Sequence, residues 1–380
     1  MTTDSPENPG TPEDLLSSSA GPVAIPVSFG SRFMVWWQLA GIGLLAIALL
    51  VLAPAVLSDF RLNNLGKYCC WAIVAVGIGL AWGRGGMLVM GQGVFFALGA
   101  YSMAMHLSLE TVGPDATPVF MILYDPLAPL PSFWVPYRSG AFTIFAIVAL
   151  PLLVSGVLGY AIFKRRVKGA YFAILSQALA VALAYLIGGT IKLTGGDTGL
   201  SDFKSFFGYE LSDPANRQMI YTIAATVLIV CLVVVWQLYR SRYGELLVAT
   251  RDAEERVRFL GYDPANVKLV AFMLAALMAS IGGALFVPLT GIISPKDINA
   301  AASIFMIAGV ALGGRAALFG PALGALAVGY GRSALSEKLE DQWIYVLALL
   351  FIVVTLVLPG GLASVPRVVG RLTGWRRVAQ

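Results

Sequence analysis

The chain has 380 residues, of which 58% are hydrophobic and only 12% are charged. Because a soluble domain carries about 25% charged residues, this composition excludes an ordinary water-soluble protein and predicts one embedded in a membrane. The net charge of +5 does not imply nucleic acid binding, since Lys and Arg also gather beside membrane spans on the cytoplasmic side.

Residues 1–33 are predicted to form a disordered cytoplasmic tail. This segment begins with residues rich in Ser, Pro, Gly and Thr, with several acids and no long apolar run. Such a composition buries too little apolar surface to fold. A cleavable signal would instead show a basic start followed by a hydrophobic stretch.

Apolar stretches follow the tail as far as residue 358. A helix needs about 20 apolar residues to cross roughly 30 Å of hydrocarbon. We expect about ten spans, some short or broken: 34–57, 65–82, 87–108, 141–163, 170–187, 218–239, 267–291, 302–314, 316–331 and 343–358. The stretches 302–314 and 316–331 are either two spans or one broken, re-entrant element, because backbone leaves the helix at membrane depth only where protein or a water-filled cavity covers it.

Lys and Arg placement predicts the orientation of these spans. The segment "KRRVK" at 164–168, the loop 240–266 and the tail 367–380 are rich in cations, and cytoplasmic loops carry such an excess. With ten spans, all three lie on the cytoplasmic side with both termini, and the loops 109–139 and 189–217 lie opposite. The prediction is an all-α, polytopic transmembrane helical bundle, with one domain at 34–366 between a tail at 1–33 and a basic tail at 367–380.

The loop 240–266 holds a charged segment with a helical pattern. Apolar residues recur at spacings of 3, 4, 4 and 3, which places them on one face of a helix; they are Leu246, Ala249, Ala253, Val257 and Leu260. Gly261 is placed to end this helix, and Asp263-Pro264 to begin the next one. The sequence thus predicts one short helix, a turn and then a span.

Three interpretations of this helix remain open: an interfacial helix on lipid headgroups, a packed structural loop, or a docking element for a soluble partner. An interfacial helix is typically dominated by Lys and Arg, with Trp, Phe or Leu on its buried face. Here the charges nearly balance and Ala fills two of the five apolar positions. This pattern favours docking into a protein groove.

The segment "RSRYGELLVATRDAEERVRFLGYDPANVKLVAF" resembles the cytoplasmic loop of permease subunits in ABC importers for branched-chain amino acids and urea. In that family the loop is the coupling helix, seated in a groove of the ATPase subunit. The resemblance therefore implies coupling to an ATPase for these positions: Gly244, Leu246, Ala249, Arg251, Asp252, Ala253, Glu254, Val257, Leu260 and Gly261.

Four further stretches are similar to motifs of the same family: "GRGGMLVMGQGVFFALGAY", "KGAYFAILSQALA", "TGGDTGLSDF" and "ALGGRAALFGPALGA". Gln177 and the Asp-Phe extension of the third stretch are closer to the urea-type second permease. The resemblance implies a bacterial cell-membrane permease that moves urea, or alternatively a branched-chain amino acid or small amide. It also implies three kinds of partner: a second permease subunit, two ATP-binding subunits and an extracytoplasmic solute-binding protein.

Gln92 and Gln177 are the candidate substrate contacts, because a polar side chain inside a span is costly to bury. An amide offers two N–H donors and a carbonyl acceptor, so a pair of amides can hydrogen-bond neutral urea. Alternatively, both glutamines hold helices together. Aromatic candidates for the substrate pathway are Phe95, Phe96, Tyr171 and Phe172, for which ordinary packing is the competing interpretation.

A Gly-rich loop is predicted on the outer side, where it is either an ordinary turn or a contact for the solute-binding protein; its residues are Thr194, Gly195, Gly196, Asp197, Thr198 and Gly199. Enzymatic activity finds no support, since the chain contains no nucleophile-elbow, zinc-protease or phosphate-binding motif. We therefore expect no cofactor and no metal, and ATP hydrolysis by partner subunits. The alternative from a different functional class is an autonomous channel or secondary carrier that works without ATPase subunits.

Overall fold

The computed structural model describes residues 29–113, 116–124, 130–167 and 169–339, together with Tyr345, Leu349, Ile352 and Gly361. The chain divides into two compact units, residues 1–44 and 45–380. Its α-helices are α1 (Phe29–Ile47), α2 (Ala53–Val56), α3 (Asp59–Ile78), α4 (Gln92–Val112), α5 (Val119–Tyr124), α6 (Gly140–Lys164), α7 (Ala170–Gly189), α8 (Ile191–Thr194), α9 (Pro214–Arg240), α10 (Arg242–Asp252), α11 (Glu254–Phe259), α12 (Pro264–Thr290), α13 (Ala300–Gly313) and α14 (Gly320–Leu339). Two π-helical segments, η1 (Ala48–Leu52) and η2 (Gly79–Arg84), extend α1 and α3, and 3-10 turns lie at η3 (Val135–Arg138), η4 (Gly196–Thr198) and η5 (Pro295–Asp297).

The predicted helical membrane fold is confirmed. Seven helical segments in the described part of the chain are long and apolar enough to cross a bilayer: Trp36–Val56, Asp59–Arg84, Gly140–Lys164, Ala170–Gly189, Pro214–Arg240, Pro264–Thr290 and Pro295–Gly313. Each overlaps one predicted span. Residues 29–33, which were assigned to the disordered tail, belong to α1. The rest of that tail, most of the predicted span 343–358 and the basic tail 367–380 lie outside the described residues.

The predicted span 87–108 is wrong at its beginning, because the helix starts at Gln92. Residues 87–91 are not helical, and Gly86 takes a positive φ of 68°. The segment lies in close contact with α7: a Cβ added to Gly91 would lie 2.0 Å from the carbonyl oxygen of Ser176. The backbone N–H of Met90 donates to the Ser176 hydroxyl at 3.2 Å. This non-helical segment is therefore covered by protein, as backbone at membrane depth requires.

The stretch 302–331 folds as two helices joined by a turn, a geometry that fits both two spans and a broken, re-entrant element. α13 has 14 residues, or about 21 Å at 1.5 Å per residue, and α14 begins only at Gly320. The two helices pack through glycines: a Cβ on Gly313 would lie 1.8 Å from the carbonyl oxygen of Gly320, and a Cβ on Gly324 2.0 Å from that of Gly309. Small residues allow such close backbone approach in membranes.

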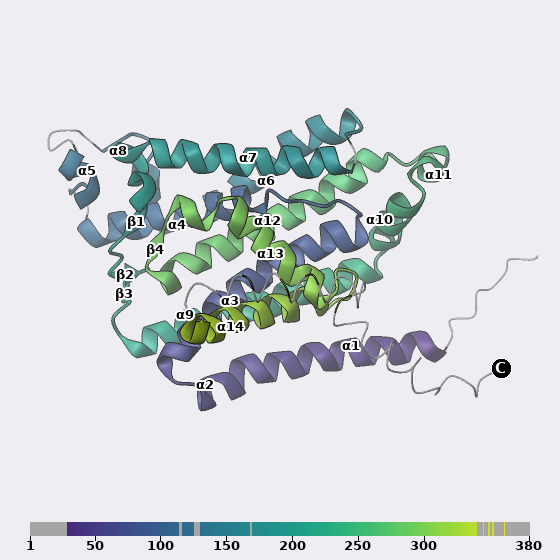
Figure 1. The fold of residues 1–380 in the computed structure, drawn as a ribbon, viewed down its shortest axis with the longest axis horizontal. Helices are drawn as coiled ribbons and strands as arrows, with labels where there is room; N and C mark the ends of the chain where they lie inside the picture. The colour runs from purple at the N-terminus through teal and green to yellow at the C-terminus, as the bar shows by residue number, and fades with distance from the viewer. Residues whose placement is uncertain are drawn as a thin grey trace, which may run out of the picture. The chain divides into compact units, whose positions relative to one another are not determined.

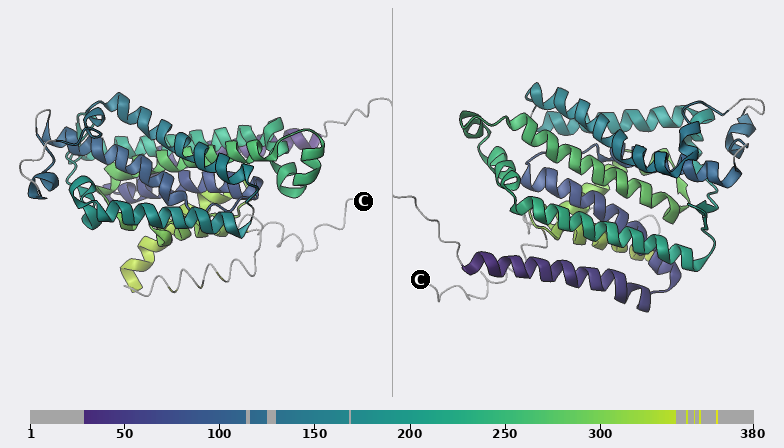
Figure 2. Two further views of the ribbon diagram at one scale, coloured as in Figure 1. Left: turned by 90° about the horizontal axis from the view of Figure 1, so that it is seen from above. Right: turned by 180° about the vertical axis from the view of Figure 1, so that it is seen from behind.

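α12 lies at the centre of residues 45–380 and packs against α3, α4 and α6 (Figures 1 and 2). Close approach again depends on glycine, since a Cβ on Gly99 of α4 would lie 1.9 Å from the carbonyl oxygen of Ser280. A Cβ on Gly283 would likewise lie 2.1 Å from the carbonyl oxygen of Phe96. These contacts explain the glycine-rich sequence of the central helices.

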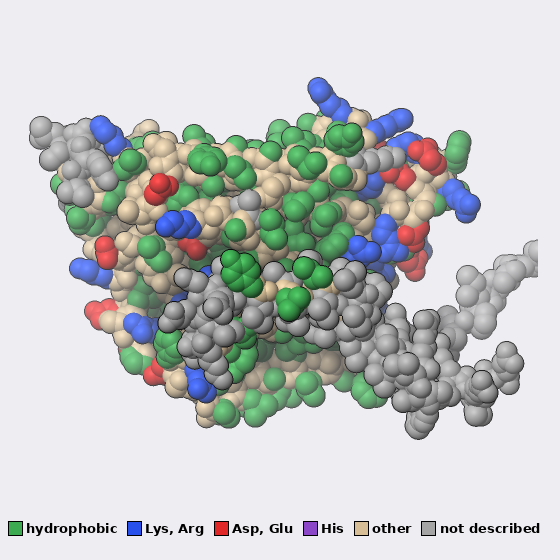
Figure 3. Space-filling model, viewed as in Figure 1, with side chains coloured by type: hydrophobic (Ala, Val, Ile, Leu, Met, Phe, Trp, Pro, Cys, Tyr) green, Lys and Arg blue, Asp and Glu red, His purple; other side chains and the backbone are tan. Residues whose placement is uncertain are grey.

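Charged side chains gather towards the two ends of the helices, and an apolar surface lies between (Figure 3). At one end are α10 and α11, where Lys164 bonds Asp263 at 2.5 Å, so the two cation-rich loops lie at the same end of the helices, as predicted. The other end carries two small antiparallel pairs, β1 (Leu200–Ser201) with β4 (Ile292–Ile293) and β2 (Ser205–Phe206) with β3 (Tyr209–Glu210). The carboxylate of Glu110 accepts hydrogen bonds from the backbone of the β2–β3 turn.

Candidate functional site

The charged segment between α9 and α12 folds as two helices, so the single helix predicted over 246–260 is wrong. α10 ends at Asp252 and α11 begins at Glu254. Between them, Ala253 takes the non-helical angles φ −149° and ψ 63°. Since Ala has the highest intrinsic helix propensity, contacts of the neighbouring residues with the rest of the protein must produce this break.

The segment is anchored on both sides of Ala253. Arg251 donates from Nη1 to the carbonyl oxygen of Gly83 at 2.7 Å, where η2 ends. Glu254 pairs with Arg258 at 2.9 Å and with Lys268 of α12 at 2.8 Å, and the Glu254 and Lys268 side chains are only 16% and 15% exposed. Arg251 thereby connects α10 to the end of η2, just before the non-helical segment that leads to α4.

The apolar side chains of α10 and α11 divide into a buried and an exposed set. Leu247 and Val257 are buried against the protein, whereas Phe259 is 90% and Leu260 76% exposed. The other members of the predicted stripe are intermediate or exposed: Leu246, Ala249 and Ala253. Sequence analysis missed Phe259, although two bulky apolar residues in succession at a helix end were a usable signal. We call Phe259 and Leu260 the projecting pair.

The predicted ends of the segment are confirmed. Gly261 takes a positive φ of 85° after α11, where a side chain is disfavoured. Asp263 caps α12 by accepting a hydrogen bond from the backbone N–H of Ala265 at 3.0 Å. The pKa of the Asp263 carboxyl group is lowered by its hydrogen bond with the Lys164 ammonium and by its bond with the backbone N–H of Ala265. The Asp263 carboxylate is therefore ionised at neutral pH.

Replacing Asp263 with Ala should therefore destabilise the protein by about 1–2 kcal/mol, from the lost cap and the lost surface ion pair. Asp213 is a matched control, because it caps α9 through Ala215 at the same 3.0 Å and no described Lys contacts its carboxylate. Denaturant unfolding in detergent measures both variants. If Asp263→Ala lowers the free energy of unfolding by no more than Asp213→Ala does, the ion pair with Lys164 does not contribute to stability.

Three side chains have buried polar atoms with no hydrogen-bond partner among the described residues: Gln92, Gln177 and Ser303. Gln92 and Ser303 are each 1% exposed. Gly91 contacts Ser176, the neighbour of Gln177, and a Cβ on Gly93 would lie 2.8 Å from the Ser303 hydroxyl. The beginning of α4 thus lies between α7 and α13. Sequence analysis missed Ser303, a lone hydroxyl in the apolar helix α13.

The aromatic candidates fall in different places. Phe95 and Phe172 both meet Phe272 edge to face, with ring centroids 5.4 and 5.7 Å apart, and line a cavity of about 390 Å³. Tyr171 is 77% exposed on α7. Phe96 instead meets Phe286 at 5.4 Å, in a different cavity.

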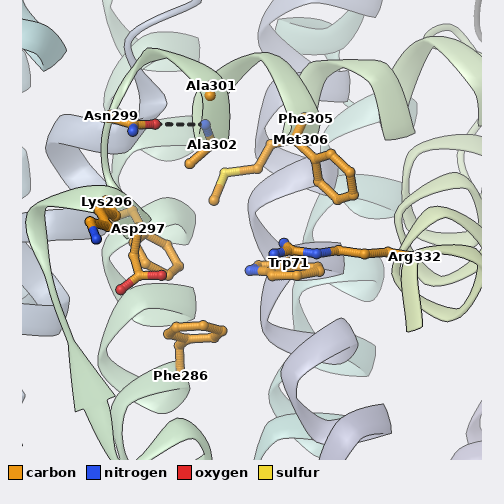
Figure 4. Close-up of a pocket in the computed structure, with 11 residues that line it drawn as sticks. Trp71, Phe286, Lys296, Asp297, Asn299, Ala301, Ala302, Phe305, Met306 and Arg332 are labelled. Atoms are coloured by element: carbon orange, nitrogen blue, oxygen red, sulfur yellow. Dashed lines mark hydrogen bonds between the residues drawn. The ribbon is translucent and has the colours of Figure 1, made fainter. Parts of the chain in front are cut away.

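This second cavity has a volume of about 270 Å³ and lies between α3, α12, α13 and α14 (Figure 4). We call it the aromatic cavity. Its residues are Trp71, Phe96, Phe286, Lys296, Asp297, Asn299, Ala301, Ala302, Phe305, Met306 and Arg332. Of these only Phe96 was a predicted site residue, because aromatic residues in separate apolar stretches give no sign in the sequence that they meet.

The Gly-rich loop forms a compact turn after α8. Gly195, Gly196 and Gly199 all take positive φ, and a Cβ on Gly199 would lie 1.9 Å from the carbonyl oxygen of Ile293. The Thr194 hydroxyl donates to the carbonyl of Ile187 at 2.7 Å. Asp197 and Thr198 are exposed, so the turn presents these two side chains at the surface.

Comparison with known proteins places the chain in a family of transport proteins. Residues 60–358 match the family described as branched-chain amino acid transport system / permease component. The chain is 27% identical to the high-affinity branched-chain amino acid transport system permease protein LivM of Escherichia coli, over 85% of this chain and 75% of that protein. It is 24% identical to the permease protein BraD of Pseudomonas aeruginosa, over 80% and 95% of the two chains, and 24% identical to the ribose import permease protein RbsC of Escherichia coli, over 82% and 90%. No solved structure matches it.

Proposed function

Because the chain belongs to the family of permease components of branched-chain amino acid transport systems, we propose that it is the translocation subunit of an ATP-driven importer in a bacterial cell membrane. Its sequence contains no phosphate-binding loop. ATP is therefore hydrolysed by partner subunits, and this chain supplies the passage and responds to their movement.

The projecting pair carries the proposal. Phe259 and Leu260 expose large apolar side chains beside a charged surface, and aromatic residues such as Phe are enriched in interfaces. They sit on a segment that Arg251 ties to Gly83. A partner ATPase that grips the pair would thus pull on the backbone leading to Gln92.

The remaining partners follow from the same function. A second permease subunit would complete the passage. The exposed Tyr171 on α7 would then line the part of the passage that faces this subunit. An extracytoplasmic solute-binding protein would deliver the cargo, with Asp197 and Thr198 as the candidate contacts. The predicted pathway residues Gln92, Gln177, Phe95, Phe96 and Phe172 remain part of this proposal.

A branched-chain amino acid is the cargo that we favour. The names of LivM and BraD support it, as does the aromatic cavity with its charged rim. Urea is the second candidate, and one observation favours it: the amides of Gln92 and Gln177 are buried without partners, and urea can satisfy such groups without bringing a charge.

Uptake into liposomes tests the function and separates the two cargoes. The importer reconstituted with its ATPases, second permease and binding protein should accumulate leucine only with ATP, and unlabelled valine should compete while urea does not. Competition by urea alone would establish the second candidate. Solute flux through this chain without ATPase subunits would instead indicate a channel or carrier and contradict the proposal.

A further inference from the structure

We propose that the aromatic cavity is a binding site inside the permease for an amino acid with an apolar side chain. The inference rests on the proposed function and names the place where this chain itself recognises its cargo. At about 270 Å³ the cavity is slightly below the roughly 300–1,000 Å³ of pockets for drug-sized ligands. That size suits a compact solute.

The walls of the cavity are suited to an aliphatic side chain. Trp71 stacks on Phe286, with ring centroids 6.1 Å apart and an interplanar angle of 24°, and meets Phe305 edge to face at 5.7 Å. Met306 adds a flexible, polarisable thioether to the lining. Burying a Val or Leu side chain against such a surface is favourable because it removes apolar area from water. A small polar solute such as urea would leave these walls unused.

Charged and polar groups lie at the edge of the same cavity, and two of them are fixed in orientation. Asp297 accepts on Oδ2 from the N–H and the hydroxyl of Ser294, at 3.0 and 3.1 Å, and no donor among the described residues bonds its Oδ1. Asn299 accepts on Oδ1 from the N–H of Ala302 at 3.0 Å (Figure 4). The Asn299 amide nitrogen therefore points away from the backbone of α13, where it can donate to a ligand.

These groups match the two ends of an amino acid zwitterion. The Asp297 carboxylate suits the substrate ammonium, and the Lys296 ammonium with the Asn299 amide suits the carboxylate. Arg332 reaches the aromatic wall from α14, with its guanidinium 5.6 Å from the Trp71 ring and 5.4 Å from the Phe305 ring, in cation–π contacts. Ionisable residues beside a cavity in a membrane domain are costly and commonly mark a substrate pathway.

Filling the cavity tests the site. Phe at position 302 adds a ring to the lining while the backbone N–H of Ala302 can still donate to Asn299. We expect Ala302→Phe in the reconstituted importer to lower ATP-driven leucine uptake at least tenfold, with a much smaller loss for alanine, because the longer side chain needs more of the cavity. Ala302→Ser, which keeps the cavity open, and Ala327→Phe, which adds the same bulk on an exposed position of α14, are the controls.

Removing a charge tests the recognition of the zwitterion. Lys296→Gln should raise the KM for leucine about tenfold with little change in kcat, as expected when binding to the charged end weakens. The same exchange at exposed Lys204 is the control. If the importer transports leucine and neither Ala302→Phe nor Lys296→Gln changes leucine uptake or its KM, the proposed binding site is wrong. The proposed function would still stand. No amino acid uptake by the unmodified importer would instead contradict the proposed function.

Discussion

A chain carrying Phe259→Asp and Leu260→Asp is expected to insert and fold normally but to lose ATP-driven uptake. The two side chains are 90% and 76% exposed, so their replacement removes little buried surface from the folded chain. In a docked complex, each new carboxylate would face an apolar groove unpaired, which is strongly unfavourable. Loss of an interface anchor typically costs about 2 kcal/mol or more, or about 30-fold in affinity for the ATPase.

Co-purification of the ATPase subunits with the permease measures this loss, and uptake into liposomes measures its consequence. The conservative pair Phe259→Leu and Leu260→Met is the control, since it keeps both positions apolar. We expect the control to retain most of its uptake. Unchanged co-purification and uptake in the aspartate variant would contradict docking through the projecting pair.

Gln92→Leu is expected to abolish uptake while it preserves or raises the stability of the protein. The amide of Gln92 is buried, and neither of its polar atoms has a hydrogen-bond partner in the described part of the chain. Leaving such a group unsatisfied costs about 1–3 kcal/mol, so an apolar side chain of similar size removes a cost. If Gln92 instead held helices together through hydrogen bonds, Gln92→Leu would lower the stability of the protein.

The same reasoning applies to Gln177→Leu, and the exposed Gln218 of α9 provides a matched control for the exchange itself. Unfolding in detergent and uptake of labelled substrate should be measured on the same preparations. Lower stability of Gln92→Leu together with normal uptake would assign Gln92 to helix packing and remove it from the pathway.

Hydropathy predicted the long helices because crossing a bilayer demands apolar length, and seven predicted spans overlap observed ones. It could not predict the beginning of α4. The run from Gly83 to Gly91 is compatible with a tightly packed helix, and its close contact with Ser176, 85 residues away from Gly91 in the chain, is not visible in the sequence.

Long-range contacts also explain the other differences. The break at Ala253 follows from Arg251 and Glu254, whose partners Gly83 and Lys268 lie in other elements. The aromatic cavity needs Trp71 and Phe305 to meet across more than two hundred residues of chain. A single sequence shows each of these residues but not the pairs they form, so the candidate site was only partly predictable.

Labelling of a cysteine at position 260 tests most directly whether an ATPase holds this segment. The native Cys69, Cys70 and Cys231 are buried, so in Leu260→Cys the introduced thiol is the accessible one. We predict that a water-soluble maleimide labels it rapidly in the isolated permease and slowly in the assembled importer, where a short bifunctional reagent links it to the ATPase subunit. Equal labelling in both states, without any crosslink to the ATPase, would contradict the proposed coupling.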